Sequence, residues 1–173
     1  MPRSDHYALW LMPPPACADA LQQVIRNLAQ TYGTPYFAPH LTLLGTLSAR
    51  REYLVSRTRQ IAAELHRITL RPARIESEDS YFRCLYIEFA QSAELAQSRE
   101  TAAAALDQPP GIFSPHMSLY YGRLASTARN RLKHALAREM PDTVPLNRLA
   151  LVDISLSVKF WHEIAEYPVG NKN

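Results

Sequence analysis

Two histidines occur in the same short sequence pattern, and their residue types and spacing suit acid–base chemistry. Residues 37–45 read FAPHLTLLG and residues 113–122 read FSPHMSLYYG, so Phe-x-Pro precedes both His40 and His116. Each histidine is followed by a long apolar residue, a hydroxyl residue (Thr42 or Ser118) and Leu. Alternate residues of a β-strand point to the same face, so we expect each histidine to project beside its hydroxyl.

This set of groups suits a phosphodiester. An imidazole with a pKa near 6.5 is neutral or protonated near neutral pH, so one histidine can accept a proton while the other donates one. The two hydroxyls can donate hydrogen bonds to the non-bridging oxygens of a phosphate. We therefore predict that one histidine takes a proton from water and that the other protonates the leaving oxygen.

Other interpretations of the two histidines fit less well. A single histidine on an apolar strand is more often a structural residue than a catalyst, but a matched pair is hard to explain in that way. A metal site is not expected, because no Asp, Glu or Cys stands at ligand spacing near either motif. The remaining histidines lack the pattern and are assigned no role: His6, His66, His134 and His162.

The elements around the two motifs suggest a duplicated half-unit. His40 and His116 are 76 residues apart, close to half of the 173-residue chain. Each motif strand, expected at 40–47 and 116–121, follows a loop that contains Pro and precedes a helix, expected at 50–66 and 127–140. On the first strand, His40, Thr42 and Leu44 should share one face. If the two strands lie side by side, both histidines and both hydroxyls meet in one cleft.

The rest of the chain predicts an α+β fold. Strands are expected at 7–12, 68–76, 82–89, 147–155 and 158–167, and further helices at 16–32 and 92–106. Pro72 places the strand 68–76 near a sheet edge. Strands arriving in pairs with helices between them favour antiparallel or mixed sheets with helices outside. No linker divides the chain, so we expect one domain, 1–173.

Composition limits the class of protein. The chain is 47% hydrophobic and 20% charged, its net charge is +3 and its pI is about 9.0, as in ordinary globular proteins with a mildly basic surface. The two cysteines, Cys17 and Cys84, form no metal or redox motif, and Cys84 should be a buried thiol. No secretion signal or membrane span is evident, so we expect a cytoplasmic monomer.

The paired motifs resemble those of the 2H phosphoesterases. The similarity extends to their cyclic phosphodiesterase branch, known from plants and yeast, through stretches 6–13, 82–86, 146–151 and 160–163. The resemblance implies a bilobal, pseudo-two-fold α+β fold with antiparallel sheets lining a central cleft. It also implies hydrolysis without metal or other cofactor. The implied reactions open ADP-ribose 1″,2″-cyclic phosphate to ADP-ribose 1″-phosphate, and nucleoside 2′,3′-cyclic phosphates to 2′-phosphates.

The resemblance also assigns residue roles. His40 and His116 would be the acid–base pair, with His40 taken as the base, while Thr42 and Ser118 would hold the phosphate. Tyr121 matches a tyrosine near the phosphate.

Two of the positions carried over leave alternatives open. Strand alternation places Tyr120 rather than Tyr121 on the face of His116, unless the strand bulges or ends first. Phe82 matches an aromatic residue that could stack on a base, and core packing is the alternative.

Two other functions stay open. An RNA 2′,3′-cyclic phosphodiesterase or 2′-5′ RNA ligase-like enzyme would act on RNA ends and would need a basic track, which scattered arginines support weakly. A non-catalytic nucleotide-binding module would have no need of a matched acid and base.

Overall fold

The main sheet has seven strands, and every strand pair described is antiparallel. The computed structural model describes residues 5–109 and 111–170. The strands run across the sheet in the order β4 (Pro72–Glu76), β5 (Leu85–Phe89), β6 (His116–Tyr120), β2 (Leu41–Leu47), β1 (Tyr7–Met12), β8 (Arg148–Asp153) and β9 (His162–Pro168). A small second sheet pairs β3 (Ile68–Leu70) with β7 (Val144–Leu146).

The strand order is symmetric about the central pair β6–β2. The chain runs β1-α1-β2-α2-β3-β4 and then repeats the same order as β5-α3-β6-α4-β7-β8. In the sheet, β4 from the first half lies beside β5, and β8 from the second half lies beside β1. Each half therefore gives its last strand to the other half, and β3 pairs with its counterpart β7. This arrangement confirms the predicted α+β, pseudo-two-fold fold, with the two motif strands as neighbours.

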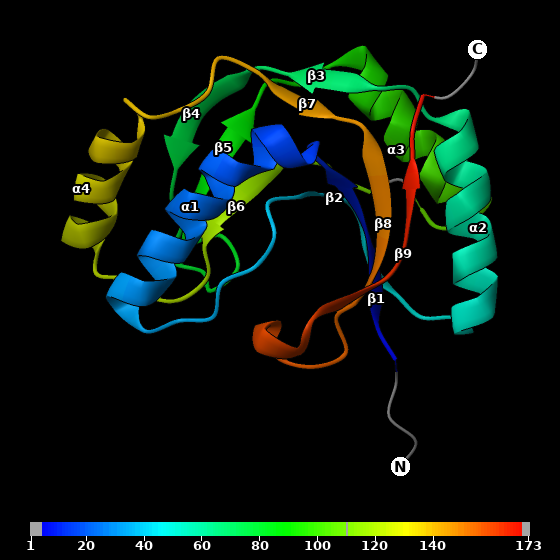
Figure 1. The fold of residues 1–173 in the computed structure, drawn as a ribbon, viewed down its shortest axis with the longest axis horizontal. Coiled ribbons are helices and arrows are strands. Elements are labelled where there is room, and N and C mark those ends of the chain that lie inside the picture. Colours follow the sequence, from blue (N-terminus) through cyan, green and yellow to red (C-terminus); the bar gives the residue numbers. More distant parts are fainter. Residues whose placement is uncertain (1–4, 110, 171–173) are drawn as a thin grey trace.

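Each helix likewise packs on strands of the other half of the chain. They are α1 (Pro15–Tyr32), α2 (Arg51–Glu64), α3 (Ala93–Ala105) and α4 (Ser126–Leu136). Helix α1 packs on β6 and α3 on β2, while α2 packs on β8 and β9 and α4 on β4. Figure 1 shows α1 and α4 toward the left of the view and α2 and α3 at the right. The predicted outer position of the helices is confirmed.

Local sequence signals set the helix ends. Helix α1 begins with Pro15 in its first turn, where a missing N–H costs nothing, and it ends at Gly33, whose φ of 68° is left-handed. The Ser92 side chain accepts a hydrogen bond from the Leu95 N–H at the start of α3.

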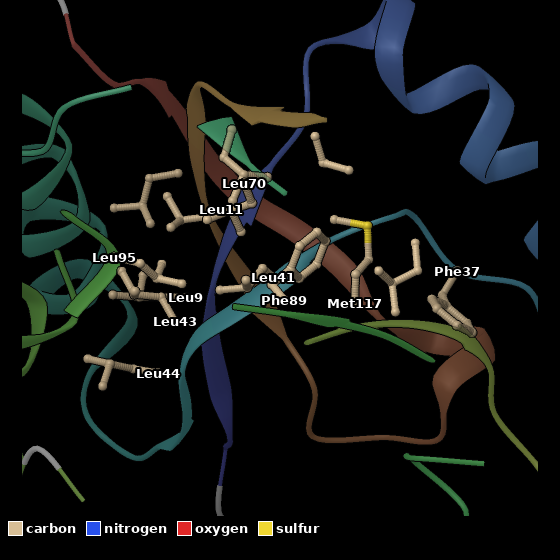
Figure 2. Packing of buried hydrophobic residues seen from close by; sticks show 14 of the residues in the cluster. Leu9, Leu11, Phe37, Leu41, Leu43, Leu44, Leu70, Phe89, Leu95 and Met117 are labelled. Carbon is tan, nitrogen blue, oxygen red and sulfur yellow. The ribbon is translucent and has the colours of Figure 1, made fainter. Parts of the chain in front are cut away.

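The core lies between the helices and one face of the sheet. Leu9, Leu11, Leu41 and Met117 are almost completely buried, and Figure 2 shows them packed together from β1, β2 and β6. Burial of each such side chain contributes about 1.5–3 kcal/mol. The opposite face of the same strands carries a separate cluster that includes Trp10, and this second face holds the site described below.

Several predicted strand boundaries were wrong. The expected strand 68–76 is two strands in different sheets, because the chain changes sheets at Arg71 and Pro72. Its second part, β4, is an edge strand, as Pro72 indicated. The expected strand 82–89 begins only at Leu85, and the expected strand 158–167 starts with a 3₁₀ turn (Val158–Phe160).

Other expectations concern the cysteines and membrane spans. Cys17 and Cys84 are both free thiols, and Cys84 is buried as predicted. Within the described part of the chain, none of the helices has the length and apolar character needed to cross a membrane. The N-terminal stretch in which we expect no secretion signal begins with residues 1–4, which lie outside the described residues.

Candidate active site

The first motif strand contains a β-bulge three residues after its histidine. In the pairing of β1 with β2, Leu9 lies opposite Leu44 and Trp10 lies opposite Thr42, so Leu43 is an extra residue. Residues directly opposite share a face, so Trp10 stands beside Thr42 while Leu44 turns into the core with Leu9. The prediction that Leu44 shares the face of the histidine was wrong because of this bulge.

The second motif strand has its bulge at the equivalent position. Leu85 lies opposite Tyr120 and Tyr86 lies opposite Ser118, so Leu119 is the extra residue in β6. The bulge turns Tyr120 into the core, and the strand ends there. Tyr121 then lines the same cavity as Ser118. Of the two tyrosines left open by the sequence, Tyr121 is the one at the site.

The backbone orients both imidazole rings in the same way. His40 Nδ1 donates to the Ala38 carbonyl at 2.7 Å, and His116 Nδ1 donates to the Ser114 carbonyl at 2.9 Å. A carbonyl oxygen can only accept a hydrogen bond, so Nδ1 carries the proton in each neutral ring. The Nε2 atom of each ring is therefore the one that can exchange a proton with a bound molecule.

One cavity of about 370 Å³ brings the six candidate residues together. They come from β2, β6 and the segments beside them: His40, Thr42, His116, Ser118, Tyr121 and Phe82. The cavity also has lining residues that the sequence did not suggest: Ala8, Trp10, Gly45, Thr46, Arg83, Ile154 and Trp161.

His40 is held in its neutral form. Its ring stacks on Trp10 with 3.5 Å between ring centroids and 8° between the planes, and only 4% of the residue is exposed. Burial lowers the pKa of His40 from 6.5 to about 4, against the opposing effect of its bond to Ala38, and the nearby His116 lowers it further. His40 is thus a neutral imidazole at neutral pH, with its lone pair on Nε2.

His116 has a different aromatic neighbour at the equivalent place. The ring of Tyr86 meets it edge-on, with 5.4 Å between centroids and 69° between planes. Burial also lowers the pKa of His116, and the Arg83 guanidinium adds to this effect, while the bond to Ser114 and the charge of Glu78 oppose it. Arg83 donates to Glu78 at 2.8 Å and to the Tyr86 hydroxyl at 3.0 Å. His116 is less buried than His40.

The polar groups between the histidines form a short chain of contacts. The Tyr121 hydroxyl lies 3.5 Å from His40 Nε2, and burial raises the pKa of Tyr121, which keeps it protonated. Ser118 Oγ donates to the Phe82 carbonyl at 3.0 Å. A serine hydroxyl has a single proton, so it must leave this carbonyl before it can donate to a ligand.

Phe82 lies at the mouth of the cavity and is not a core residue. It is 51% exposed, its ring is 5.9 Å from Trp161 with 13° between the planes, and it meets Tyr121 edge-on at 5.3 Å. The core-packing alternative for Phe82 is therefore wrong, and the ring is available to a ligand.

Sequence reasoning missed Trp10, Thr46 and Arg83. The stacking of Trp10 on His40 depends on the β1–β2 register, which the β1 sequence alone does not show. Arg83 directly follows Phe82 in the sequence, so the sequence-based candidate Phe82 was its immediate neighbour. Thr46 lines the cavity and has a left-handed φ of 58°, which is rare for a β-branched residue and marks strained backbone of the kind that functional sites often contain.

The titratable groups that line the cavity are His40, His116, Arg83 and Tyr121. Of these side chains, the imidazoles are the ones whose ordinary pKa allows proton exchange near neutral pH. The described residues contain no cluster of three or more His, Cys, Asp or Glu side chains that could hold a metal ion.

Comparison with known proteins identifies one family. The family model described as cyclic phosphodiesterase-like protein matches residues 6–167. A Thermus thermophilus protein, TT0787, has a TM-score of 0.61 at 16% identity, over 97% of this chain and 100% of that chain. Escherichia coli LigT complexed with ATP gives 0.60 at 16% identity, over 96% and 98%. LigT complexed with 3′-AMP gives 0.60 at 11% identity, over the same shares. The TM-scores show a shared fold, and at these low identities they show the fold alone. No curated protein matches the chain significantly.

Proposed function

The chain belongs to the cyclic phosphodiesterase-like family of the 2H phosphoesterases, and we propose that it opens the cyclic phosphate of a small nucleotide by two-histidine catalysis. Membership of this family makes it a phosphodiesterase. One observation carries the proposal: two identically oriented imidazoles, each beside a hydroxyl, line one cavity but have different surroundings.

The proposed substrates are nucleoside cyclic phosphates. ADP-ribose 1″,2″-cyclic phosphate would give ADP-ribose 1″-phosphate, and nucleoside 2′,3′-cyclic phosphates would give 2′-phosphates. A cavity of about 370 Å³ is in the usual size range for small-molecule sites, and the exposed ring of Phe82 offers a surface for a base. The complexes of Escherichia coli LigT with 3′-AMP and ATP support a nucleotide ligand for this fold.

Thr42 and Ser118 would bind the phosphate. Their hydroxyls stand two residues after the histidines, one on each of the neighbouring strands β2 and β6, and line the same cavity, so they can donate to the two non-bridging oxygens. Ser118 would exchange its bond to the Phe82 carbonyl for one to the phosphate. Substrate binding would thereby free the Phe82 carbonyl, on the residue whose ring we expect to contact the base.

The two histidines differ in burial and in their neighbours, and we use this difference to decide which one accepts a proton and which one donates it. His40, with its pKa of about 4, stays unprotonated near neutral pH and is therefore the histidine available as the base: its Nε2 takes a proton from water as the water oxygen bonds to phosphorus. His116, which is less buried, gives the proton on its Nε2 to the ester oxygen as the phosphorus–oxygen bond breaks. The product is a phosphomonoester with a free hydroxyl, and exchange with solvent restores both histidines.

Turnover in the presence of EDTA tests the proposal. We would incubate the purified protein with ADP-ribose 1″,2″-cyclic phosphate, with adenosine 2′,3′-cyclic phosphate and with a short RNA ending in a 2′,3′-cyclic phosphate. His40→Ala and His116→Ala should each abolish turnover, whereas His134→Ala, at an exposed position on α4, should not. Full activity of either active-site variant would refute the mechanism.

The same assay decides between the remaining possibilities. Turnover of RNA alone would assign the protein to RNA-end processing, and binding without turnover would favour a nucleotide-binding module. The monomeric state and the cytoplasmic location stay predictions, which light scattering and cell fractionation would check.

A further inference from the structure

Arg99, a half-buried residue of α3, contacts the segments of both histidine motifs. Its Nη1 donates to the carbonyl of Leu43 in the first motif, and its guanidinium carbon lies 4.6 Å from the centroid of the Phe113 ring in the second. A Cβ added to Gly111, in the loop before the second motif, would lie 3.7 Å from Arg99 Nη2. Arg99 does not line the catalytic cavity, so these contacts are made outside it.

The contact with Leu43 holds the bulge of β2. Leu43 is the extra residue of that bulge and is completely buried. A bulge disrupts the regular pairing of the strands, so a buried carbonyl there needs another donor. A guanidinium supplies a charge-assisted hydrogen bond, which is stronger than one between neutral groups. Arg99 therefore stabilises the bulge that keeps Thr42 beside Trp10 and turns Leu44 into the core.

The contact with Phe113 reaches the segment that orients His116. Phe113 immediately precedes Ser114, whose carbonyl accepts a hydrogen bond from His116 Nδ1. The Arg99 guanidinium lies within the range of a cation–π attraction to the Phe113 ring. Arg99 thus fixes the chain one residue before the carbonyl that orients this imidazole.

The contacts of Arg99 differ from the support that is repeated in the two halves. The Phe37 carbonyl accepts from Gln22 at 3.0 Å, and the equivalent Phe113 carbonyl accepts from Gln91 at 2.8 Å. Each of these bonds lies within one half of the chain. Arg99 instead joins a strand of the first half to a loop of the second.

The direct pairing of the two motif strands is short. Within the described residues, the register of β2 with β6 consists of one pair, Leu41 opposite Met117. A single pair leaves the relative position of the two strands to be fixed by other contacts. Arg99 supplies one two residues further along β2, at Leu43.

We propose that Arg99 is a positioning residue for the hydrolysis: by joining Leu43 to Phe113 it fixes the relative position of the two motifs and of the catalytic groups that they carry. This inference rests on the proposed function, because it adds a residue to that reaction. Arg99 acts through the backbone of the motifs and does not touch the substrate.

The test measures kcat and KM of Arg99→Met with adenosine 2′,3′-cyclic phosphate and ADP-ribose 1″,2″-cyclic phosphate. Methionine keeps an unbranched side chain but removes the donor and the charge. We expect kcat to fall about tenfold to a hundredfold with a smaller change in KM, since small displacements of reacting groups have effects of this size. Arg99→Lys keeps the charge and should restore part of kcat.

Arg57→Met is the matched control. Arg57 also stands on a helix, α2, and lies 5.4 Å from an aromatic ring, that of Tyr53, but it contacts neither motif. Its kcat should equal that of the wild type. Unchanged kcat in a folded Arg99→Met protein would overturn the inference.

A double-mutant cycle separates positioning from a merely structural role. A structural arginine would lower the temperature of unfolding without changing the kcat of the folded protein. If Arg99 positions Thr42, then Arg99→Met should lower kcat by a smaller factor in the Thr42→Ala background than in the wild type. Equal factors in the two backgrounds would contradict the proposal. If Arg99→Met does not fold, Arg99→Lys and Phe113→Leu take its place, and wild-type kcat in both would overturn the inference.

Failure of this inference can be told apart from failure of the proposed function. A wild-type protein that hydrolyses neither substrate would refute the proposed function, but NMR of the histidine rings would still test Arg99. The His40 ring stacks on Trp10, so its proton signals depend on its exact position over the indole. Arg99→Met should shift the ring signals of His40 and His116 and leave those of His134, exposed on α4, in place. Unshifted signals of both catalytic histidines would overturn the inference.

Discussion

Replacing Trp10 should change the pH at which His40 loses its proton. The indole covers one face of the His40 ring at 3.5 Å, and burial is the main cause of the low pKa. Trp10→Ala admits water to that face, so the charged imidazole becomes easier to form. The pKa of His40 should therefore rise from about 4 toward its ordinary value of 6.5.

The size of the change follows from the contacts of the ring. A fall in pKa from 6.5 to about 4 corresponds to about 3 kcal/mol against the imidazolium. Trp10 covers one of the two faces, so its removal should return up to half of this, a rise of about one pH unit. Loss of a cation–π contact acts in the opposite direction, but the low pKa shows that burial outweighs it in the folded protein.

The acid limb of kcat/KM is the kinetic measure of this pKa, because it reports the base of the free enzyme. In the wild type the limb should lie near pH 4, with an alkaline limb below pH 6.5 from His116. Trp10→Ala should move the acid limb upward and leave the alkaline limb in place. An NMR titration of the His40 ring protons gives the same pKa without turnover.

Trp161→Ala is the control for this experiment, because Trp161 contacts Trp10 but not the His40 ring. Its acid limb should stay near that of the wild type. Loss of a large buried ring can cost about 3–5 kcal/mol, so Trp10→Phe would be measured alongside. An unmoved His40 pKa in a folded Trp10→Ala protein would refute burial as its cause, and with it the argument for His40 as the base.

Three further outcomes are expected. The unfolded chain binds more protons than the folded protein between pH 6.5 and about 4, so the free energy of unfolding should fall by up to about 3 kcal/mol as pH decreases through this range. Urea titrations of His40→Gln should show a flatter dependence, and an identical one would contradict the low pKa. Thr42→Ala and Ser118→Ala should each lower kcat about tenfold to a thousandfold, as loss of one anion donor does; unchanged kcat in both would exclude them as phosphate ligands. Thr46→Gly should raise stability by roughly 1 kcal/mol by relieving its left-handed backbone, and thermal unfolding that occurs earlier would show that the threonine is not strained.

The sequence was sufficient to find the candidate catalytic pair and the fold class. The repeated pattern around His40 and His116 predicted both the neighbouring strands and the shared cleft. The bulges at Leu43 and Leu119 could not be predicted, because each leucine has the apolar character of an ordinary strand residue. Without them, alternation assigned the wrong face to Leu44 and left Tyr121 undecided.

The surroundings of the histidines depend on contacts between distant segments. The stacking of Trp10 on His40 follows from the strand register, and the position of Trp161 follows from a 3₁₀ turn where the sequence predicted a strand. Such contacts determine how deeply each histidine is buried and what surrounds its ring, and no local pattern encodes them.

Because the two halves exchange their last strands, we expect catalytic competence to arise late in folding. Neither β1-α1-β2 nor β5-α3-β6 can complete its part of the sheet without the other half, because β1 requires β8 and β5 requires β4. The central contact, Leu41 opposite Met117, closes a long stretch of chain, and such distant pairings form slowly. We therefore expect the two imidazoles to meet only once both halves of the sheet have formed.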